Sequence, residues 1–227
     1  MKLGGLQQCS LIDYPGHICA VVFTIGCNFH CPYCHNPELV NETAEEIDVE
    51  EFFSFLKKRV GLLDGVTVTG GEPTVHTDLL QFIGRIKELG FKVKLDSNGT
   101  NPDMLKEAVA ANLIDYIAMD IKSPLARYSE TVARPTDVAS IKASIDWLRS
   151  GTVPYEFRTT VIKSFLSTDD FHIIGQEIAG AKNYYLQKFI PTKLLNPSFL
   201  KKTTYSDDEF VTIAEIMKQY VETCQIR

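Results

Sequence analysis

Six short β-rich runs alternate with six amphipathic helical stretches along the chain, and this rhythm restricts the fold more than any other feature. Strands are predicted over residues 18–25, 65–70, 91–96, 115–121, 155–162 and 184–190. Helices are predicted over residues 49–60, 78–90, 102–113, 138–150, 170–180 and 208–222. Strands that are separated by helices favour a parallel sheet wound in one sense, so the predicted fold class is α/β.

Two architectures fit this order: an open doubly wound sheet and a barrel. Six units are too few to close an eight-stranded barrel, so a barrel of this chain would be partial. No linker or internal repeat interrupts the 227 residues, which predicts a single domain over 1–227, with an N-terminal segment at 1–17 and six β-α units over 18–222. Local signals support the helix boundaries: Asp48 with Glu51 resembles a capping box, Pro102 suits a first helical position, and Gly90 suits a helix C-terminus.

Composition excludes several classes of function. The net charge is −6, and Lys57–Lys58–Arg59 and Lys201–Lys202 are isolated basic groups with acidic residues nearby, so no nucleic-acid surface is predicted. The N-terminus lacks the apolar core of a signal peptide, and the apolar run from Ile18 is far shorter than the ~20 residues of a membrane span. We therefore expect a cytoplasmic protein without membrane contact, whose clustered cysteines serve metal or redox chemistry.

Unusual residues follow the predicted strands at their carboxyl ends, where parallel β/α folds collect their chemistry. In chain order these are the cysteine loop 26–36, "GGEP" at 70–73, "DSNG" at 96–99, "DIK" at 120–122, Arg158 within the fifth strand, and Lys193 after the sixth. We expect these groups to lie on one rim of the sheet.

The loop "GCNFHCPYCHN" holds Cys27, Cys31 and Cys34 in the spacing C-x3-C-x2-C. A structural zinc site needs four ligands, and His30 or His35 would have to supply the fourth, which the spacing makes difficult. A disulfide leaves one thiol over, and an ordinary ferredoxin cluster takes four thiolates. Three thiolates on a four-iron cluster leave one iron open, and an open coordination position is typical of a catalytic metal site.

With Tyr33 before the last cysteine, and with "GGEP" after the second strand, this loop resembles the motifs of radical S-adenosylmethionine (SAM) enzymes. The segment "LIDYPGHICAVVFTIGCNFHCPYCHNPELV" is further similar to the glycyl-radical-enzyme activating proteins, including the activators of pyruvate formate-lyase and of anaerobic ribonucleotide reductase. The resemblance implies a partial (β/α)6 barrel of the radical SAM type. It also implies reductive cleavage of SAM to a 5′-deoxyadenosyl radical, which removes hydrogen from a glycine of a partner glycyl radical enzyme.

The resemblance also implies roles for individual residues. The three cysteines would bind a 4Fe–4S cluster. The residues implied in SAM binding are Tyr33, Gly70, Gly71, Glu72, Ser97, Asn98, Asp120, Lys122 and Arg158. The two glycines would admit a close approach of the backbone to the methionine amino group. Asp96 and Asp120, with Ser97, would hold a monovalent cation.

The implied partners are a glycyl radical enzyme, with anaerobic ribonucleoside-triphosphate reductase as first choice, and a low-potential electron donor such as flavodoxin. The alternative is a radical SAM enzyme that acts on a small molecule. A non-catalytic electron carrier would need a fourth cluster cysteine. Lys193 stands where some activators carry a histidine, and Lys193, Cys9, Cys19 and Cys224 receive no role.

Overall fold

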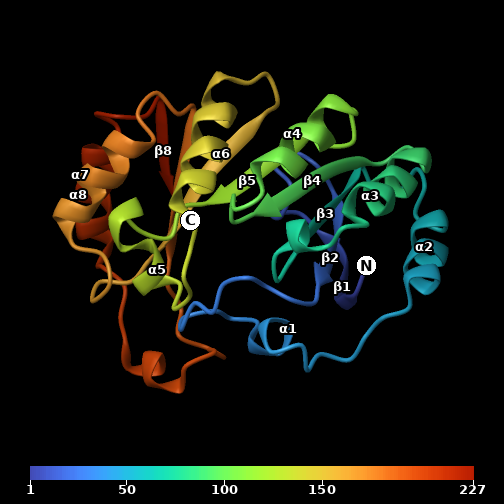
Figure 1. Cartoon of the computed structure of the whole chain (residues 1–227), viewed down its shortest axis with the longest axis horizontal. Coiled ribbons are helices and arrows are strands. Elements are labelled where there is room, and N and C mark those ends of the chain that lie inside the picture. The colour runs from blue at the N-terminus through green and yellow to red at the C-terminus, as the bar shows by residue number, and fades with distance from the viewer. The chain divides into compact units, whose positions relative to one another are not determined.

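Eight strands form one sheet in the computed structural model, which describes residues 1–227 (Figure 1). The strands are β1 (Leu3–Ser10), β2 (Cys19–Thr24), β3 (Gly65–Gly70), β4 (Lys92–Ser97), β5 (Tyr116–Asp120), β6 (Tyr155–Val161), β7 (Asn183–Lys188) and β8 (Thr223–Ile226). Their order in the sheet is their order in the chain. Each strand lies next to the strands that precede and follow it in the chain, as in a barrel and not as in a doubly wound sheet. The structure therefore confirms the α/β class and agrees with a partial (β/α)6 barrel.

Helices connect most of the strands. The α-helices are α1 (Pro37–Val40), α2 (Val49–Lys57), α3 (Leu79–Glu88), α4 (Pro102–Ala110), α5 (Tyr128–Thr131), α6 (Val138–Ser150), α7 (Thr168–Glu177) and α8 (Asp207–Met217). Short 3₁₀ turns are η1 (Pro73–Val75), η2 (Leu125–Arg127) and η3 (Pro197–Lys201). None of these helices combines the length and the apolar composition that crossing a membrane requires.

The chain divides into two compact units, each with its own core. The first comprises Met1–Asn28, Glu38–Ser97 and Asp103–Ile117. Within it β1 pairs antiparallel with β2, and β2, β3 and β4 pair in parallel. Phe52 of α2 stacks on Phe82 of α3 with ring centroids 5.5 Å apart, and both rings are buried. This aromatic contact joins the two helices through their apolar faces.

The second unit comprises Phe29–Pro37, Asn98–Pro102 and Ala118–Arg227. Here β6, β7 and β8 pair in parallel. Glu156 of β6 is fully buried and accepts two hydrogen bonds from the Arg227 guanidinium, at 2.9 and 3.1 Å. That guanidinium also lies over the Tyr185 ring, 3.4 Å from its centroid. A bidentate pair of this kind offsets the loss of hydration of the buried carboxylate and joins Arg227 to β6.

All six predicted strands and all six predicted helices are present. Two further strands of the structure were not predicted from the sequence. β1 lies in the N-terminal segment 1–17, and β8 follows the helix that was expected to close the last unit. In "LGGLQQCS" two glycines and two glutamines hide the alternation of a strand, and "TCQI" is too short to give a period. The last helix ends at Met217 rather than at residue 222, because the chain turns there into β8.

The predicted helix ends are present, but α2 has only the Asp48 half of the predicted capping box, since the Glu51 side chain makes no return bond to the Asp48 N–H. The Asp48 side chain accepts hydrogen bonds from the backbone N–H groups of Glu50 and Glu51, so it is the N-cap of α2. α4 begins at Pro102. Gly90 follows α3 with φ of +87°, the left-handed conformation expected after a helix. Local sequence therefore sets the ends of these helices independently of the sheet.

Candidate active site

In the first unit, the end of β3 is hydrogen-bonded to the residues immediately before Cys27. The Gly71 N–H donates to the Thr24 carbonyl at 2.9 Å. The Glu72 N–H donates to the Gly26 carbonyl at 2.8 Å. Because both bonds run between backbone groups, the "GGEP" segment holds the start of the cysteine loop in a defined position.

Gly70 and Gly71 are required because the backbone of residues 24–26 lies too close to leave room for a side chain. Gly70 has φ of +115°, which side-chain-bearing residues rarely adopt, and a Cβ there would overlap the Thr24 backbone. A Cβ on Gly71 would lie well inside van der Waals contact with the Gly26 carbonyl oxygen. The structure thus gives both glycines a packing role between neighbouring backbone segments, in addition to any approach to a ligand.

Glu72 is a buried carboxylate at the centre of a hydrogen-bond network in the first unit. Its Oε1 accepts from the Thr74 hydroxyl at 2.5 Å, from the Thr74 N–H at 3.2 Å, and from the Ser97 hydroxyl at 2.8 Å. Ser97 ends β4, so this network links the carboxyl ends of β3 and β4. These donors fix the carboxylate and supply the hydrogen bonds that a buried anion requires.

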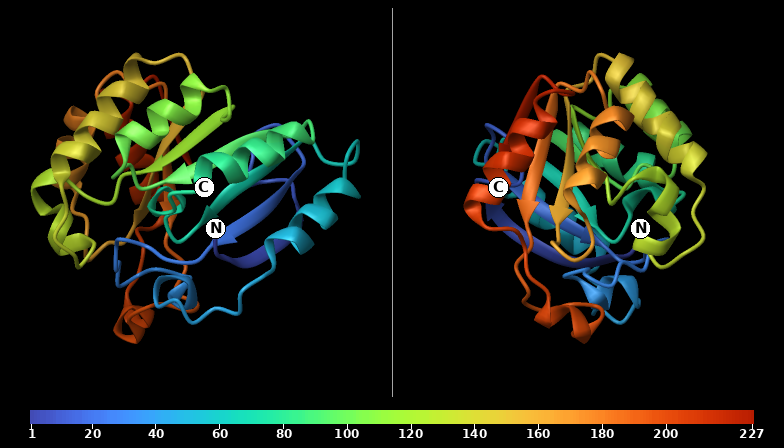
Figure 2. Two further views of the ribbon diagram at one scale, coloured as in Figure 1. Left: turned by 45° about the vertical axis from the view of Figure 1, so that its right-hand side comes forward. Right: turned by 90° about the vertical axis from the view of Figure 1, so that its left-hand side faces the viewer.

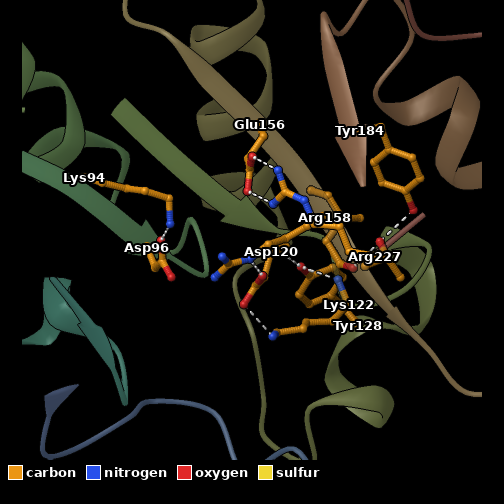
Figure 3. Close-up of polar contacts among 11 residues, drawn as sticks. Lys94, Asp96, Asp120, Lys122, Tyr128, Glu156, Arg158, Tyr184 and Arg227 are labelled. Carbon is orange, nitrogen blue, oxygen red and sulfur yellow. Dashed lines mark hydrogen bonds and ion pairs between the residues drawn. The ribbon is translucent and has the colours of Figure 1, made fainter. Parts of the chain in front are cut away.

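Lys94 and Asp96 form a second polar pair on β4 (Figure 3). The Lys94 side chain is 3% exposed and its ammonium group contacts the Asp96 carboxylate. The neighbouring Val93 and Leu95 are fully buried on the alternate positions of the strand. A buried lysine is tolerated here because its partner offsets the loss of hydration.

In the second unit, Cys31 and Cys34 lie in a tight turn, with the Cys34 N–H donating to the Cys31 carbonyl at 3.0 Å. Tyr33 between them is buried, and its ring contacts the rings of Phe165 and Phe199, with centroids 5.9 and 6.4 Å away. The aromatic residue of the motif therefore anchors the loop in the core of this unit and does not face solvent.

Burial raises the pKa of the Cys31 thiol to about 11, and the nearby positive charge of Lys122 offsets only part of this effect. When no metal ion is bound, burial therefore favours the neutral form of this thiol. Coordination to a metal ion deprotonates such a thiol outright, because the metal supplies the positive charge that the buried thiolate lacks.

Asp120 carries two cationic partners at the end of β5, as Figure 3 shows. The Arg158 Nε donates to Oδ1 at 2.5 Å, and the Lys122 ammonium donates to Oδ2 at 2.8 Å. Burial alone would raise the pKa of Asp120, but these two charges hold it well below its usual range. Burial likewise opposes the charge on Lys122, and the Asp120 carboxylate keeps the pKa of Lys122 raised. The group is therefore ionised throughout and carries one net positive charge.

Tyr128 of α5 holds the backbone that carries Asp120 and Lys122. Its hydroxyl accepts from the Lys122 N–H at 3.1 Å and donates to the Asp120 carbonyl at 3.2 Å. The ring is fully buried and contacts the Phe29 ring, with centroids 6.0 Å apart. Because the hydroxyl contacts backbone on both sides of Ile121, Tyr128 positions the loop that carries both charged side chains.

Asn98 serves a turn within the second unit. Its Oδ1 accepts from the Thr100 hydroxyl at 2.7 Å and from the Thr100 N–H at 3.1 Å. The next carbonyl, that of Gly99, accepts from the Ser144 hydroxyl of α6 at 2.7 Å. These contacts fix the "DSNG" turn and assign Asn98 at least a structural task.

Comparison with known proteins identifies the family to which these motifs belong. A family model described as the radical SAM superfamily matches residues 21–166. The chain belongs to the radical SAM superfamily. A protein of Methanocaldococcus jannaschii named as a glycyl-radical enzyme activating enzyme is 34% identical over 230 residues, which cover 99% of this chain and 95% of that protein.

One further relative agrees with this membership, and one solved structure shows the same fold. The pyruvate formate-lyase-activating enzyme of Clostridium pasteurianum is 31% identical over 127 residues, which cover 53% of this chain and 52% of that enzyme. The crystal structure of a domain of pyruvate-formate lyase-activating enzyme from Bacteroides vulgatus superposes with a TM-score of 0.59 at 19% identity, covering 72% of this chain and 98% of that domain. The predicted resemblance to activating enzymes is thereby confirmed at the level of family.

The side chains present fit the cofactors of a radical SAM enzyme. None of Cys27, Cys31 and Cys34 forms a disulfide, and thiolate sulfur is the ligand that iron–sulfur clusters use. Lys122 and Arg158 place two cationic side chains beside Asp120, and cations of this kind suit an anionic group of a ligand. The chemistry of the donor set therefore agrees with a cluster and with the charged methionine part of SAM.

The structure groups the predicted residues in two sets. The first unit contains Cys27, Gly70, Gly71, Glu72, Asp96 and Ser97, and the second contains Cys31, Tyr33, Cys34, Asn98, Asp120, Lys122 and Arg158. The monovalent cation remains a prediction: Asp96 is paired with Lys94, and Asp120 with Lys122 and Arg158. Lys193 is exposed in the loop after β7.

Three supporting residues were missed by the sequence analysis. Lys94 and Thr74 hold Asp96 and Glu72, and Tyr128 holds the loop from Asp120 to Lys122. Lys94 could have been found, because it lies between two apolar residues in the strand "KVKL". Both faces of a parallel sheet are usually covered, so a lysine in such a strand is expected to be buried and to need a partner. Thr74 and Tyr128 gave no such signal. Thr74 contacts Glu72 only two residues away in the turn after β3, and Tyr128 contacts backbone six to eight residues away, so neither contact follows from a helix or strand period.

We predict that Gly71→Ala destabilises the protein, because the new methyl group would collide with backbone atoms that cannot rotate away. The expected loss in the free energy of unfolding is about 1–3 kcal/mol, measured by urea denaturation of the metal-free protein. Gly84→Ala is the matched control, since its Cβ would meet only Leu113 at 4.0 Å and it lies within α3. Gly84→Ala should be neutral or slightly stabilising. Equal stability of the two variants would contradict the packing role.

Proposed function

We propose that this protein is an activase that cleaves SAM reductively and uses the resulting radical to remove hydrogen from a glycine of a partner glycyl radical enzyme. The observation that carries the proposal is the three-thiol loop in a chain whose full length matches a protein named as a glycyl-radical enzyme activating enzyme. When bound by three thiolates, a 4Fe–4S cluster supplies the one electron that breaks a carbon–sulfur bond of SAM, giving methionine and a 5′-deoxyadenosyl radical.

The residues of the chain would bind and orient the reactants. Cys27, Cys31 and Cys34 would be the thiolate ligands. We assign Lys122 and Arg158 to the carboxylate of the methionine moiety, since both are cationic side chains held beside Asp120 at the end of β5. The other residues we assign to SAM binding are Tyr33, Gly70, Gly71, Glu72, Ser97 and Asn98. For Glu72 the support is a buried carboxylate held by Thr74 and Ser97, which suits an ammonium group.

The proposed protein substrate is a glycyl radical enzyme, and anaerobic ribonucleoside-triphosphate reductase is the first choice. The support for this choice is the resemblance of the segment from Leu11 to Val40, which includes the "DYPG" turn. A low-potential electron donor such as flavodoxin would complete the reaction. We place the reaction in the cytoplasm, where thiols remain reduced.

The test uses the anaerobically reconstituted protein with a reductant, SAM and the candidate reductase. We expect about four irons per chain, formation of 5′-deoxyadenosine, and a doublet organic-radical signal in electron paramagnetic resonance. Replacing the radical glycine of the partner with alanine should remove the signal and leave complex formation intact.

A second measurement separates the proposal from its main alternative. SAM cleavage coupled to hydrogen loss from a small metabolite, with no partner protein present, would favour a small-molecule radical SAM enzyme. The absence of a glycyl radical with every available glycyl radical enzyme, while SAM is cleaved normally, would contradict the activase assignment.

A further inference from the structure

The segment after β7, residues 189–206, differs in charge from the rest of the chain. It contains the adjacent Lys201 and Lys202 and no aspartate or glutamate. The acidic residues Asp207, Asp208 and Glu209 follow it directly, and two of them are already paired, Asp207 with Lys188 and Glu209 with Lys163. Two apolar side chains lie in solvent beside these lysines, Ile190 at 64% exposure and Leu200 at 46%. Figures 1 and 2 show this orange-red segment extending away from the strands of the second unit.

The same segment is bonded directly to the cysteine loop. The Leu195 N–H donates to the Cys34 carbonyl, and the Asn196 N–H donates to the Pro32 carbonyl, both at 2.9 Å. The His35 Nε2 lies 2.8 Å from the Ile190 carbonyl oxygen, which makes this nitrogen the hydrogen-bond donor. Residues 190–196 therefore lie along the backbone of Pro32–His35 and contact the carbonyl of one cysteine.

Aromatic packing makes the exposed surface continuous with the buried part of the loop. Phe199 of η3 is buried against Phe165, with centroids 5.3 Å apart, and against Tyr33, the residue that precedes Cys34. The Lys202 ammonium lies 6.0 Å from the centroid of the Phe199 ring. A protein that contacts Leu200, Lys201 and Lys202 would thus sit over side chains that touch the cysteine loop.

We infer that residues 189–202 form the docking surface for an acidic one-electron donor protein of the flavodoxin class. The inference rests on the proposed function, because SAM cleavage consumes one electron. The donor protein loses this electron and the enzyme gains it. A basic surface with exposed apolar residues attracts an acidic partner and gives it a small contact area. Electron-transfer complexes are of this weak, small and charge-steered kind, which allows the oxidised donor to leave after each transfer.

The experiment measures binding of an oxidised acidic flavodoxin to the reconstituted enzyme, together with the rate of enzyme reduction by the reduced flavodoxin. The variant is Lys201→Glu with Lys202→Glu. The control is Lys57→Glu with Lys58→Glu, an adjacent pair of lysines exposed at the end of α2 that produces the same change in net charge. At low salt we expect about a tenfold fall in binding affinity and in the reduction rate for the variant, and little change for the control. The difference should shrink as salt increases.

Reduction by dithionite separates this inference from the proposed function. The Lys201/Lys202 variant should cleave SAM normally with dithionite, which needs no docking surface. Wild-type affinity for flavodoxin in this variant, or an equal loss in the control, would overturn the inference. Loss of glycyl-radical formation with dithionite, at unchanged flavodoxin affinity, would assign the surface to the glycyl radical enzyme instead and would also overturn it. Failure of the wild-type enzyme to cleave SAM would count against the proposed function alone, because flavodoxin binding is measured independently.

Discussion

Cys31→Ala should abolish SAM cleavage and reduce the iron content of the reconstituted protein. A 4Fe–4S cluster that has only three protein ligands cannot lose one and still hold a defined open position, since two thiolates leave two irons without protein ligands. Cys31 is buried in the turn that also carries Cys34, so its replacement by alanine removes one of the three sulfur atoms of the loop. Iron and sulfide analysis and chromatography of 5′-deoxyadenosine measure the two effects.

Cys9→Ala provides the matched control for this prediction. Cys9 is an exposed free thiol on β1, outside the cysteine loop, so its removal should leave iron content and cleavage unchanged. Unfolding of the metal-free proteins should be similar for both variants, which would exclude loss of fold as the cause. Full cleavage by the Cys31→Ala enzyme would overturn the assignment of the cluster ligands.

Asp120→Ala should destabilise the protein and reduce SAM cleavage more than it reduces iron content. The change leaves Arg158 and Lys122 adjacent and without the carboxylate that balances them, in a site where Asp120 is only 24% exposed. Removing one partner of a fully buried ion pair costs about 3–5 kcal/mol, and partial exposure lowers our expectation here to about 2 kcal/mol. We expect cleavage to fall by at least roughly tenfold, because mispositioned cations no longer orient the ligand.

Asp146→Ala is the control for this site. Asp146 also pairs with one lysine and one arginine, Lys142 at 2.5 Å and Arg149 at 3.3 Å, but its side chain is 50% exposed on α6. Exposed pairs contribute little, so this variant should change stability by less than about 1 kcal/mol and leave cleavage unaltered. Similar losses for the two variants, in urea denaturation and in SAM cleavage, would contradict a special role for Asp120.

The sequence by itself determined the order of six of the eight strands and of the six longer helices, and it supplied the candidate residues of the site. Periods of hydrophobic residues placed six strands and six helices, since burial against a neighbouring layer imposes the pattern locally. Because the carboxyl ends of parallel strands collect functional groups, the same assignments placed Glu72, Asp96 and Asp120 at or near strand ends, and Arg158 within a strand. The spacing of the three cysteines then indicated the family without any structure.

Only the tertiary structure decided how those residues are held. β1 and β8 lack a period of their own and form because β2 and β7 offer them partners. Gly71 is needed because another backbone segment lies against it, and Tyr128 of α5 supports the loop after β5 through a contact that no helix or strand period predicts.

The lysines at 201 and 202 show the same division most clearly. In the sequence they are an ordinary surface pair, and the structure places them on a segment whose backbone is hydrogen-bonded to the cysteine loop more than 150 residues earlier in the chain. Helices and strands impose periodic patterns of apolar residues on neighbouring positions, so they can be predicted from the sequence. Contacts between distant segments depend on which surfaces the folded backbone brings together, and those are specified only by the packing of the whole unit.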